Sequence, residues 1–245
     1  MSVFFVSSQA IHNKSLTIHG PLHSHLTKSL RYRVGDSIWC VDEKRQRYQV
    51  RIASLTKQSL EGTIVGQQNG PPKQPVFIGL GLSILKGDHM TWAIQKATEL
   101  GVHTIFPIMS HRCIVRPDAD RAQSYQARWQ RIALDAAQQS ERWDVPHVHL
   151  PCDLSTFLAS HEQDMKFILV ERGTPNKTTA FSLDEGFQGN LTIASGPEGG
   201  WTDEERKEAN QNNFHDVTLG TTIFRAETAP LVALALIQSQ LGEFG

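Results

Sequence analysis

The sequence predicts an α/β protein in two parts, a small β-barrel followed by a mostly parallel sheet that helices cover on both faces. Three observations support this prediction. Short alternating runs dominate the first 70 residues, strand and helix patterns alternate from residue 76 onward, and a stretch rich in glycine and proline separates the parts at 67–75. We therefore expect one domain over residues 1–70 and a second over residues 74–245.

The first part is expected to contain several short strands and one small helix. The runs 15–19, 37–41, 48–55 and 60–65 alternate apolar and polar residues, as strands with one buried face do, and 3–6 is a short apolar run. A helix fits residues 23–30, ahead of a turn at Val34, Gly35 and Asp36. Several short strands in so short a segment are typical of a small β-barrel.

The second part alternates between strand and helix patterns. Apolar runs at 76–82, 104–108, 166–170, 191–194 and 214–219 predict strands. Helices are expected at 88–100, 119–140, 202–212 and 227–241, with Asp88 as the N-cap of the first and Gly101 just after it. Such alternation builds a parallel sheet covered on both faces, and ligands of these sheets bind beyond the carboxyl ends of the strands.

Composition excludes several classes of protein. Hydrophobic residues make up 39% of the 245 residues and charged residues 20%, which indicates a globular chain rather than a disordered one. No apolar run is long enough to cross a membrane, and the first residues lack the features of a signal peptide. Cys40, Cys113 and Cys152 lie far apart. We therefore expect a cytoplasmic protein with neither a disulfide framework nor a metal site.

Charge is divided unevenly along the chain. Residues 1–72 hold 9 Lys and Arg against 4 Asp and Glu, whereas residues 73–245 hold 15 against 21. A basic module joined to an acidic one favours binding of a polyanion, such as nucleic acid, by the first part. An excess of this size also arises by chance, so charge alone leaves both interpretations open.

A glycine-rich loop follows the strand expected at 191–194. It reads Ser195-Gly196-Pro197-Glu198-Gly199-Gly200-Trp201, and Thr202 with Glu205 then has the form of a capping box. Glycines let the backbone approach a ligand closely. The loop lacks the phosphate-loop and dinucleotide patterns, and Glu198 would repel a phosphate. It is either a ligand loop or a tight turn between strand and helix.

Two further loops carry charged residues where strands end. Residues 219–229 hold Arg225 and Glu227 close to an expected helix start, and Glu171 and Arg172 follow the strand at 166–170. Charged residues are also common at solvated helix starts and strand ends. The chain has no pattern typical of a serine nucleophile. The residues alone therefore predict an α/β domain with a ligand loop and leave its chemistry open.

Four motifs occur in order along the chain: Gln95-Lys96-Ala97-Thr98-Glu99-Leu100-Gly101-Val102, Gln139-Ser140-Glu141-Arg142, Gly196-Pro197-Glu198-Gly199-Gly200 and Ile223-Phe224-Arg225-Ala226-Glu227-Thr228-Ala229. Each is weak alone, but the four in register resemble the RsmE family, bacterial small-subunit ribosomal RNA methyltransferases of the SPOUT superfamily. Residues 30–36 are similar to part of that family's first domain, a PUA-like β-barrel that contacts RNA. Two departures are the lack of an early Arg in residues 1–5 and Phe224 in place of the family's Leu.

The resemblance implies a SPOUT-type parallel sheet with a carboxy-terminal trefoil knot, in a homodimer whose active sites form where two knots meet. It implies S-adenosylmethionine as cofactor, no metal or membrane, and 3-methyluridine in 16S ribosomal RNA of the small subunit as product. By matching motif, three loops are expected to bind the cofactor through Leu169, Val170, Glu171, Gly173, Ser195, Gly196, Pro197, Glu198, Gly199, Gly200, Leu219, Gly220, Ile223, Phe224 and Arg225.

The same resemblance suggests roles in the reaction. We expect Arg225 to stabilise the uridine anion that develops as N3 loses its proton, and Glu227 or Glu198 to accept or position that proton. Because N3 lies on the base-pairing edge, the target uridine must be unpaired or flipped out. The basic first domain is expected to bind phosphates and 2′-hydroxyls of folded RNA through Arg31, Arg33, Arg45 and Arg47, and Arg142 of the second domain is a further candidate contact.

Three alternatives stay open at the level of sequence. One is a SPOUT enzyme that acts on another RNA, such as transfer RNA. Another is a non-catalytic RNA-binding assembly factor that keeps the fold, although the intact glycine loop and Arg225 argue against it. The last is a nucleotide-dependent enzyme, which Glu198 disfavours.

Overall fold

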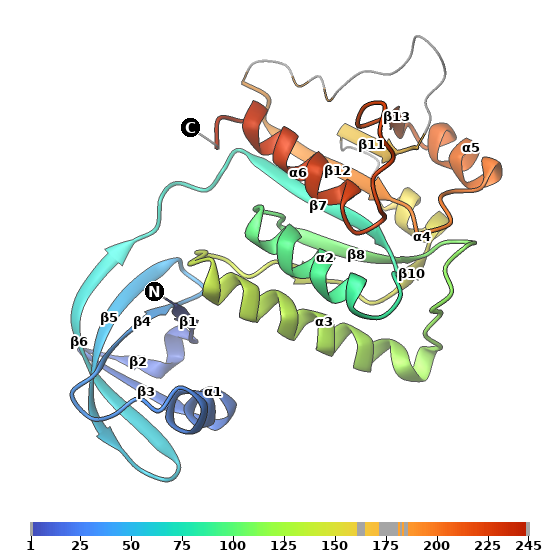
Figure 1. Ribbon diagram of the computed structural model, residues 1–245. Helices are drawn as coiled ribbons and strands as arrows, with labels where there is room; N and C mark the ends of the chain where they lie inside the picture. Colours follow the sequence, from blue (N-terminus) through green and yellow to red (C-terminus); the bar gives the residue numbers. More distant parts are fainter. Residues whose placement is uncertain (1, 161–164, 172–180, 182, 184–185, 244–245) are drawn as a thin grey trace. The chain divides into compact units, whose positions relative to one another are not determined.

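The computed structural model describes residues 2–160, 165–171, 181, 183 and 186–243, which form two compact units (Figure 1). The first unit contains Met1–Lys73 together with Ala137–Asp144, and the second contains Gln74–Ala136 and Val145–Gly245. Residues 137–144, which the sequence places in the second domain, thus pack with the first unit.

A six-stranded sheet curls around the core of the first unit (Figure 1). Its order is β1-β4-β5-β6-β3-β2, and every pair is antiparallel except β1 with β4. The enclosed core includes Phe4, Leu16, Ile38 and Val50. The barrel expected from the sequence is therefore a curled sheet with β1 and β2 at its edges. Its elements are β1 (Val3–Phe5), the 3-10 turn η1 (Ser8–Ala10), β2 (Ile11–His12), β3 (Ser15–His19), α1 (Gly20–Ser24), the π turn η2 (His25–Ser29), β4 (Ser37–Val41), β5 (Gln46–Leu55) and β6 (Ser59–Asn69).

Two boundaries in this unit differ from the expectation. The short helix begins at Gly20 rather than residue 23, because Pro21 is favourable in a first turn, where its missing N–H is not needed. Strand β6 continues to Asn69, which pairs with Gln46 of β5. Residues 67–69 of the expected linker therefore belong to a strand, because the ladder with β5 overrides their loop-like composition.

The second unit is built on a parallel sheet of order β10-β8-β7-β12-β11-β13, with β9 beside β8. The parallel sheet expected from the alternating pattern is confirmed. Short elements between residues 147 and 159 escaped prediction. The elements are β7 (Val76–Ser83), α2 (Asp88–Glu99), β8 (Thr104–Met109), α3 (Ala119–Gln139), β9 (His147–Val148), β10 (Cys152–Asp153), α4 (Leu154–Ala159), β11 (Met165–Leu169), β12 (Gly189–Ser195), α5 (Asp203–Gln211), β13 (His215–Val217) and α6 (Ala229–Gln240).

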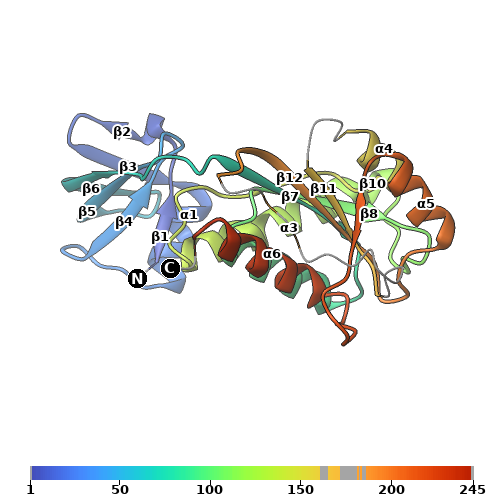
Figure 2. The same ribbon diagram turned by 90° about the horizontal axis from the view of Figure 1, so that it is seen from above.

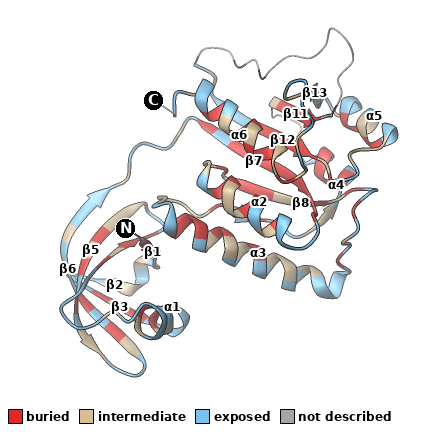
Figure 3. Ribbon diagram, in the orientation of Figure 1, coloured by how far each residue is buried: buried red, intermediate tan, exposed pale blue. Residues whose placement is uncertain are grey.

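Helices cover both faces of this sheet (Figures 1 and 2). On one face, Ile78 and Leu80 of β7 share a core with residues of α2, α3 and α6. On the other, Gly81 of β7 lies so close to the Phe157 ring of α4 that an added Cβ would overlap the ring. Successive residues of a strand point to opposite faces, so β7 is buried from both sides, as Figure 3 shows.

Two helix starts correct the sequence-based assignment. The N-cap of α2 is Gly87, at a φ of +54°, and not Asp88, which is the first helical residue. The final helix begins at Ala229 rather than residue 227, with Thr228 as its N-cap and Pro230 in its first turn. Glu227 therefore lies in the loop before α6.

Candidate functional site

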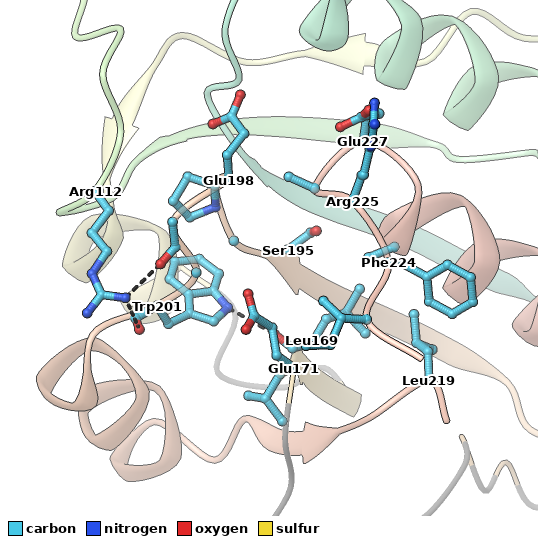
Figure 4. A pocket seen from close by; sticks show the side chains of 18 of the residues that line it. Arg112, Leu169, Glu171, Ser195, Glu198, Trp201, Leu219, Phe224, Arg225 and Glu227 are labelled. Atoms are coloured by element: carbon cyan, nitrogen blue, oxygen red, sulfur yellow. Dashed lines mark hydrogen bonds between the residues drawn. The ribbon is translucent and has the colours of Figure 1, made fainter. Parts of the chain in front are cut away.

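Three neighbouring strands bring three loops to one edge of the sheet. Strand β11 pairs in parallel with β12 on one side and with β13 on the other. The carboxyl ends of parallel strands meet at the same edge, so the segments that follow them lie together. They enclose a cavity of about 530 Å³ (Figure 4).

The cavity gathers the cofactor residues expected from the motifs. Every one of them that the structure describes lines it, and Gly173 lies outside the described residues. The lining residues from that set are Leu169, Val170, Glu171, Ser195, Gly196, Pro197, Glu198, Gly199, Gly200, Leu219, Gly220, Ile223, Phe224 and Arg225.

The glycine loop needs its glycines for different reasons. Gly200 has a φ of +68°, and its N–H donates to the Pro197 carbonyl at 2.9 Å, which closes a tight turn. A Cβ on Gly200 would lie 3.3 Å from Oε1 of Glu171, and one on Gly196 would lie 3.2 Å from the Trp201 ring. The backbone of this loop is therefore open to a ligand and has little room for side chains.

A capping box fixes where the loop ends. The Thr202 hydroxyl accepts from the Glu205 N–H at 3.1 Å, and Oε2 of Glu205 accepts from the Thr202 N–H at 2.8 Å. Oε1 of Glu205 also accepts from the N–H of His111 at 2.6 Å, in the segment after β8. The predicted capping box is confirmed, and its buried carboxylate also joins two segments that are distant in sequence.

Arg112 and Trp201 hold the glycine loop against its neighbours. Nη1 of Arg112 donates to the carbonyls of Gly199 at 2.6 Å and Trp201 at 3.3 Å, and Nε1 of Trp201 donates to the Leu169 carbonyl at 3.0 Å (Figure 4). The sequence did not reveal Arg112. Its position shortly after the strand expected at 104–108 could have indicated it, because ligands bind beyond the carboxyl ends of all strands of such a sheet.

The expected catalytic residues Arg225, Glu227 and Glu198 all line this cavity. Glu227 is only 9% exposed, and its Oε1 lies 3.0 Å from Nδ1 of His89. Oε1 of Glu198 accepts from the N–H of Lys86 at 3.0 Å. Arg225 is exposed, and Figure 4 shows its side chain and that of Glu227 extending in the same direction from their loop.

His89 and Lys86 are further residues that sequence reasoning missed. Both follow β7, the strand beside β12, and so reach the same edge of the sheet. Their position just after a strand was the only signal in the sequence, because residues 86–89 lack the compact motifs that mark the later loops.

The five candidate RNA-binding arginines divide into two groups. Arg31 and Arg33 are exposed between η2 and β4. Arg45 forms an ion pair with Asp144 at 3.2 Å, and the Arg47 guanidinium stacks over the Trp143 ring at 3.8 Å. The second group thus binds the 137–144 segment within the first unit.

Arg142 belongs to this internal cluster. Burial lowers the pKa of its guanidinium to about 10, nearby Asp144 acts to raise it, and Arg45 acts to lower it. Arg142 is partly buried whereas Arg31 and Arg33 are exposed, which makes Arg31 and Arg33 the more accessible candidates for phosphate contacts.

Neither a metal centre nor a membrane span emerges from the described part of the chain. Within it, no three His, Cys, Asp or Glu side chains are grouped so as to hold a metal ion. None of its helices combines the length and apolarity that crossing a bilayer requires.

Comparison with known families identifies both parts of the chain. The model of an RNA methyltransferase domain matches residues 72–238, and that of an RNA methyltransferase PUA domain matches residues 24–65. The first match covers the parallel sheet and its cavity, and the second covers much of the curled sheet.

Individual relatives resemble the chain over nearly its whole length. A protein named ribosomal RNA small subunit methyltransferase E from Bacillus subtilis is 32% identical, over 92% of this chain and 90% of its own. The protein of the same name from Synechocystis is 31% identical, over 96% and 77%. The crystal structure of a ribosomal RNA small subunit methyltransferase E from Neisseria gonorrhoeae bound to S-adenosyl methionine superposes with a TM-score of 0.86 at 32% identity, covering 100% of both chains.

Proposed function

The chain belongs to the ribosomal RNA small subunit methyltransferase E family, and we propose that it transfers a methyl group from S-adenosylmethionine to N3 of a uridine in 16S ribosomal RNA. The observation that carries this proposal is the cavity at the carboxyl ends of β11, β12 and β13, which gathers every described residue of the expected cofactor set. The relative from Neisseria gonorrhoeae, solved with S-adenosyl methionine, supports the choice of cofactor.

The residues of the cavity fit this cofactor. The backbone at Gly196, Gly199 and Gly200, which carries no side chains, offers peptide groups to a polar ligand, and side chains at these positions would meet Trp201, Arg112 or Glu171. Leu169, Leu219 and Phe224 add apolar walls. When bound, S-adenosylmethionine would supply a methyl group on a positively charged sulfur. Glu171 also lines the cavity, and its carboxylate suits a ligand that carries positive charge.

The rest of the reaction requires residues that act on the acceptor uridine. Uridine N3 loses its proton to a base, and the electron pair left on N3 would form the bond to the methyl carbon as the bond from that carbon to sulfur breaks, with the sulfur leaving as a neutral thioether. We assign Arg225 to stabilise this developing negative charge, because a neighbouring cation lowers the pKa of the acid it faces. Glu227 and Glu198 are the candidate proton acceptors at the same cavity.

We assign RNA binding to the unit of the curled sheet, and Arg31 and Arg33 are the exposed residues among its candidate arginines. The match of residues 24–65 to an RNA methyltransferase PUA domain supports this assignment. Arg45 and Arg47 keep a place in the proposal as residues that shape this surface, because they anchor the 137–144 segment, to which Arg142 itself belongs.

We also propose that the protein works in the cytoplasm as a homodimer with a trefoil knot in its carboxy-terminal part. The strand order supports the knot. β12 lies between β7 and β11, and after the edge strand β13 the chain returns to pack α6 against β12 and α2. Sedimentation equilibrium tests the dimer, and a monomer at assay concentration would contradict it.

The central experiment is transfer of labelled methyl groups to RNA. Purified protein and labelled S-adenosylmethionine are incubated with small ribosomal subunits from a strain lacking this activity, and with transfer RNA in parallel. We expect label only in 16S ribosomal RNA, with 3-methyluridine identified by mass spectrometry of the nucleosides. Label in transfer RNA, or on another base, would overturn the proposed substrate. RNA binding without methyl transfer would indicate an assembly factor.

A single substitution tests the assigned role of Arg225. Arg225→Ala is expected to lower the rate of a single turnover by about 100-fold, the scale of one well-placed electrostatic group, without a comparable loss of affinity for S-adenosylmethionine. Full single-turnover activity with unchanged RNA affinity would exclude Arg225 from the reaction.

A further inference from the structure

A second hollow adjoins the cofactor cavity. It has a volume of about 670 Å³ and lies between the start of α2 and the residues before α6. His89, Arg225 and Glu227 line both hollows. A group bound in the second hollow would therefore lie beside a group bound in the first.

The second hollow offers positive charge to a ligand. Lys86 and Arg225 are exposed, and neither side chain has an ion-pair partner within the described ranges. The buried carboxylate of Glu227 is already engaged with Nδ1 of His89 at 3.0 Å, and Asp88 is a further, exposed acid of the lining. The contact with Glu227 leaves Nε2 as the nitrogen of His89 that is able to meet a ligand.

An aromatic side chain completes the lining. Trp92 follows His89 by three positions on α2, so the two lie on the same side of that helix. The indole is 42% exposed, although it is one of the largest apolar groups of the unit. Unpaired bases bind proteins by stacking on such rings, while cations near them meet the phosphates.

We propose that the second hollow receives the acceptor uridine of the RNA, with its base stacked on Trp92 and its flanking phosphates near Lys86 and Arg225. This inference rests on the proposed function and adds where the RNA base binds. Arg225 and Glu227, which line both cavities, then lie beside the place where the base meets the cofactor. A base that reaches this position has left its stack, as N3 chemistry requires.

The test compares two exposed aromatic residues of the same unit. Trp92→Leu removes the stacking surface and keeps an apolar side chain, Trp92→Phe keeps a ring, and Phe77→Leu changes a residue on β7 that is 47% exposed and lines neither hollow. For each variant we measure the KM for small subunits, kcat, the Kd for S-adenosylmethionine by calorimetry, and the oligomeric state by sedimentation.

We expect Trp92→Leu to raise the KM for small subunits about tenfold or more, the scale of one base–aromatic stack. Trp92→Phe should stay within about threefold of the parent protein, and Phe77→Leu should not differ from it. Affinity for S-adenosylmethionine and sedimentation should be unchanged in all three. Arg225 is left out of this comparison because it also serves the reaction.

Three results would overturn the inference. One is an unchanged KM in Trp92→Leu. Another is a fold increase in the Kd for S-adenosylmethionine as large as the fold increase in KM, which would assign Trp92 to the first cavity. The third is a shift of Trp92→Leu to a smaller species, which would assign the indole to a contact between copies of the chain. If the parent protein methylates no RNA at all, the proposed function is wrong and the inference falls with it.

Discussion

At the scale of single residues, the cavity proposed to bind the cofactor depends on backbone positions that have little room for a side chain. Gly200 combines a φ of +68° with a close approach to the Glu171 carboxylate. The left-handed conformation costs an L-residue with a Cβ about 1–2 kcal/mol, and the Cβ would lie 3.3 Å from Oε1 of Glu171, so that this carboxylate would have to shift slightly. Strain and crowding therefore act at the same point of the ligand loop.

The substitution Gly200→Ala separates these effects when it is compared with Gly35→Ala. Gly35 also has a positive φ, +96°, but an added Cβ would meet nothing within 4 Å. Both variants should lose about 1 kcal/mol of stability, whereas only Gly200→Ala should weaken binding of S-adenosylmethionine, by about tenfold or more. Denaturant unfolding and calorimetry measure the two quantities. Equal cofactor affinities in the two variants would show that the Glu171 contact has no role in binding.

Residues 196–200 and Arg225 were predictable from the sequence because each belongs to a short motif of consecutive residues. Sequence reasoning missed His89 and Arg112, which reach the site only because β7 and β8 end at the same edge of the sheet. A contact such as the one between His89 and Glu227 is long-range, and no local pattern encodes it.

At the scale of elements, helix α5 is held at its start by hydrogen bonds that also shape the site. The Thr202 hydroxyl satisfies one N–H of the first turn, and Glu205 returns the bond to Thr202 and holds His111. The capping residues thus couple the position of the helix to the glycine loop before it and to the segment after β8.

Thr202→Ala is expected to cost about 1 kcal/mol of unfolding free energy, because an N–H of the first turn loses its acceptor. Thr202→Ser keeps the hydroxyl and should cost little. Urea unfolding followed by circular dichroism measures both. A stability loss in the Ser variant equal to that in the Ala variant would mean that the methyl group, and not the cap, carries the effect.

Helix α4 has a cap whose strength depends on pH. Oδ1 of Asp153 accepts from the N–H of Thr156 at 2.7 Å, and the hydrogen bonds to Thr156 lower the pKa of Asp153 in the folded protein. A lowered folded pKa stabilises the protein above the unfolded pKa, about 3.9, and this contribution disappears as pH falls through the folded value. Because Asp153 is largely exposed, the effect is small.

Asp153→Asn keeps an acceptor without the titrating charge. The urea midpoint of the variant should lie below that of the parent protein at pH 7, and the gap should narrow as pH approaches 4 and below. Urea unfolding of both proteins over a pH series, down to the lowest pH that still gives a cooperative transition, measures this difference. If the difference in urea midpoint between the parent protein and the variant grew as the pH fell, the charged cap of Asp153 would not be its cause.

The elements themselves were largely predictable, and the errors have local physical causes. Asp88 is a good N-cap by composition, yet Gly87 takes that position because the turn after β7 needs a positive φ. The strands β9 and β10 have two residues each, too few for any periodicity to show.

At the scale of the whole molecule, the excess of positive over negative residues and the candidate cavity belong to different units. The first unit carries the basic excess of residues 1–72, and the second carries the cavity. The uneven charge was visible in the sequence. That Arg45 and Arg47 bind the 137–144 segment was not predictable, because this segment lies far along the chain from both arginines.

RNA binding should therefore weaken with salt in a way that depends on particular arginines. Each phosphate contact contributes about 0.7–0.9 to the slope of log affinity against log salt concentration. Arg31→Ala combined with Arg33→Ala should reduce this slope by about 1–2, while Arg121→Ala, which removes an exposed partner of Asp118 in the second unit, should leave it unchanged. Filter binding over a salt series provides the measurement, and equal slopes in the double variant and the parent protein would contradict the assignment.

The pairing of β7 with β12 has a consequence for how the protein is made. Residues 76–83 are buried except at Phe77. One edge of this strand pairs with β8, which follows soon in the chain, but the other edge pairs with β12, which begins only at Gly189. The ribosome therefore releases β7 well before the partner of that second edge exists, and closure of such distant pairs is slow. Until residues 189–195 emerge, the nascent chain carries an unpaired edge that favours aggregation. Efficient production of this protein should therefore respond to chaperones that hold nascent chains and to lower growth temperature.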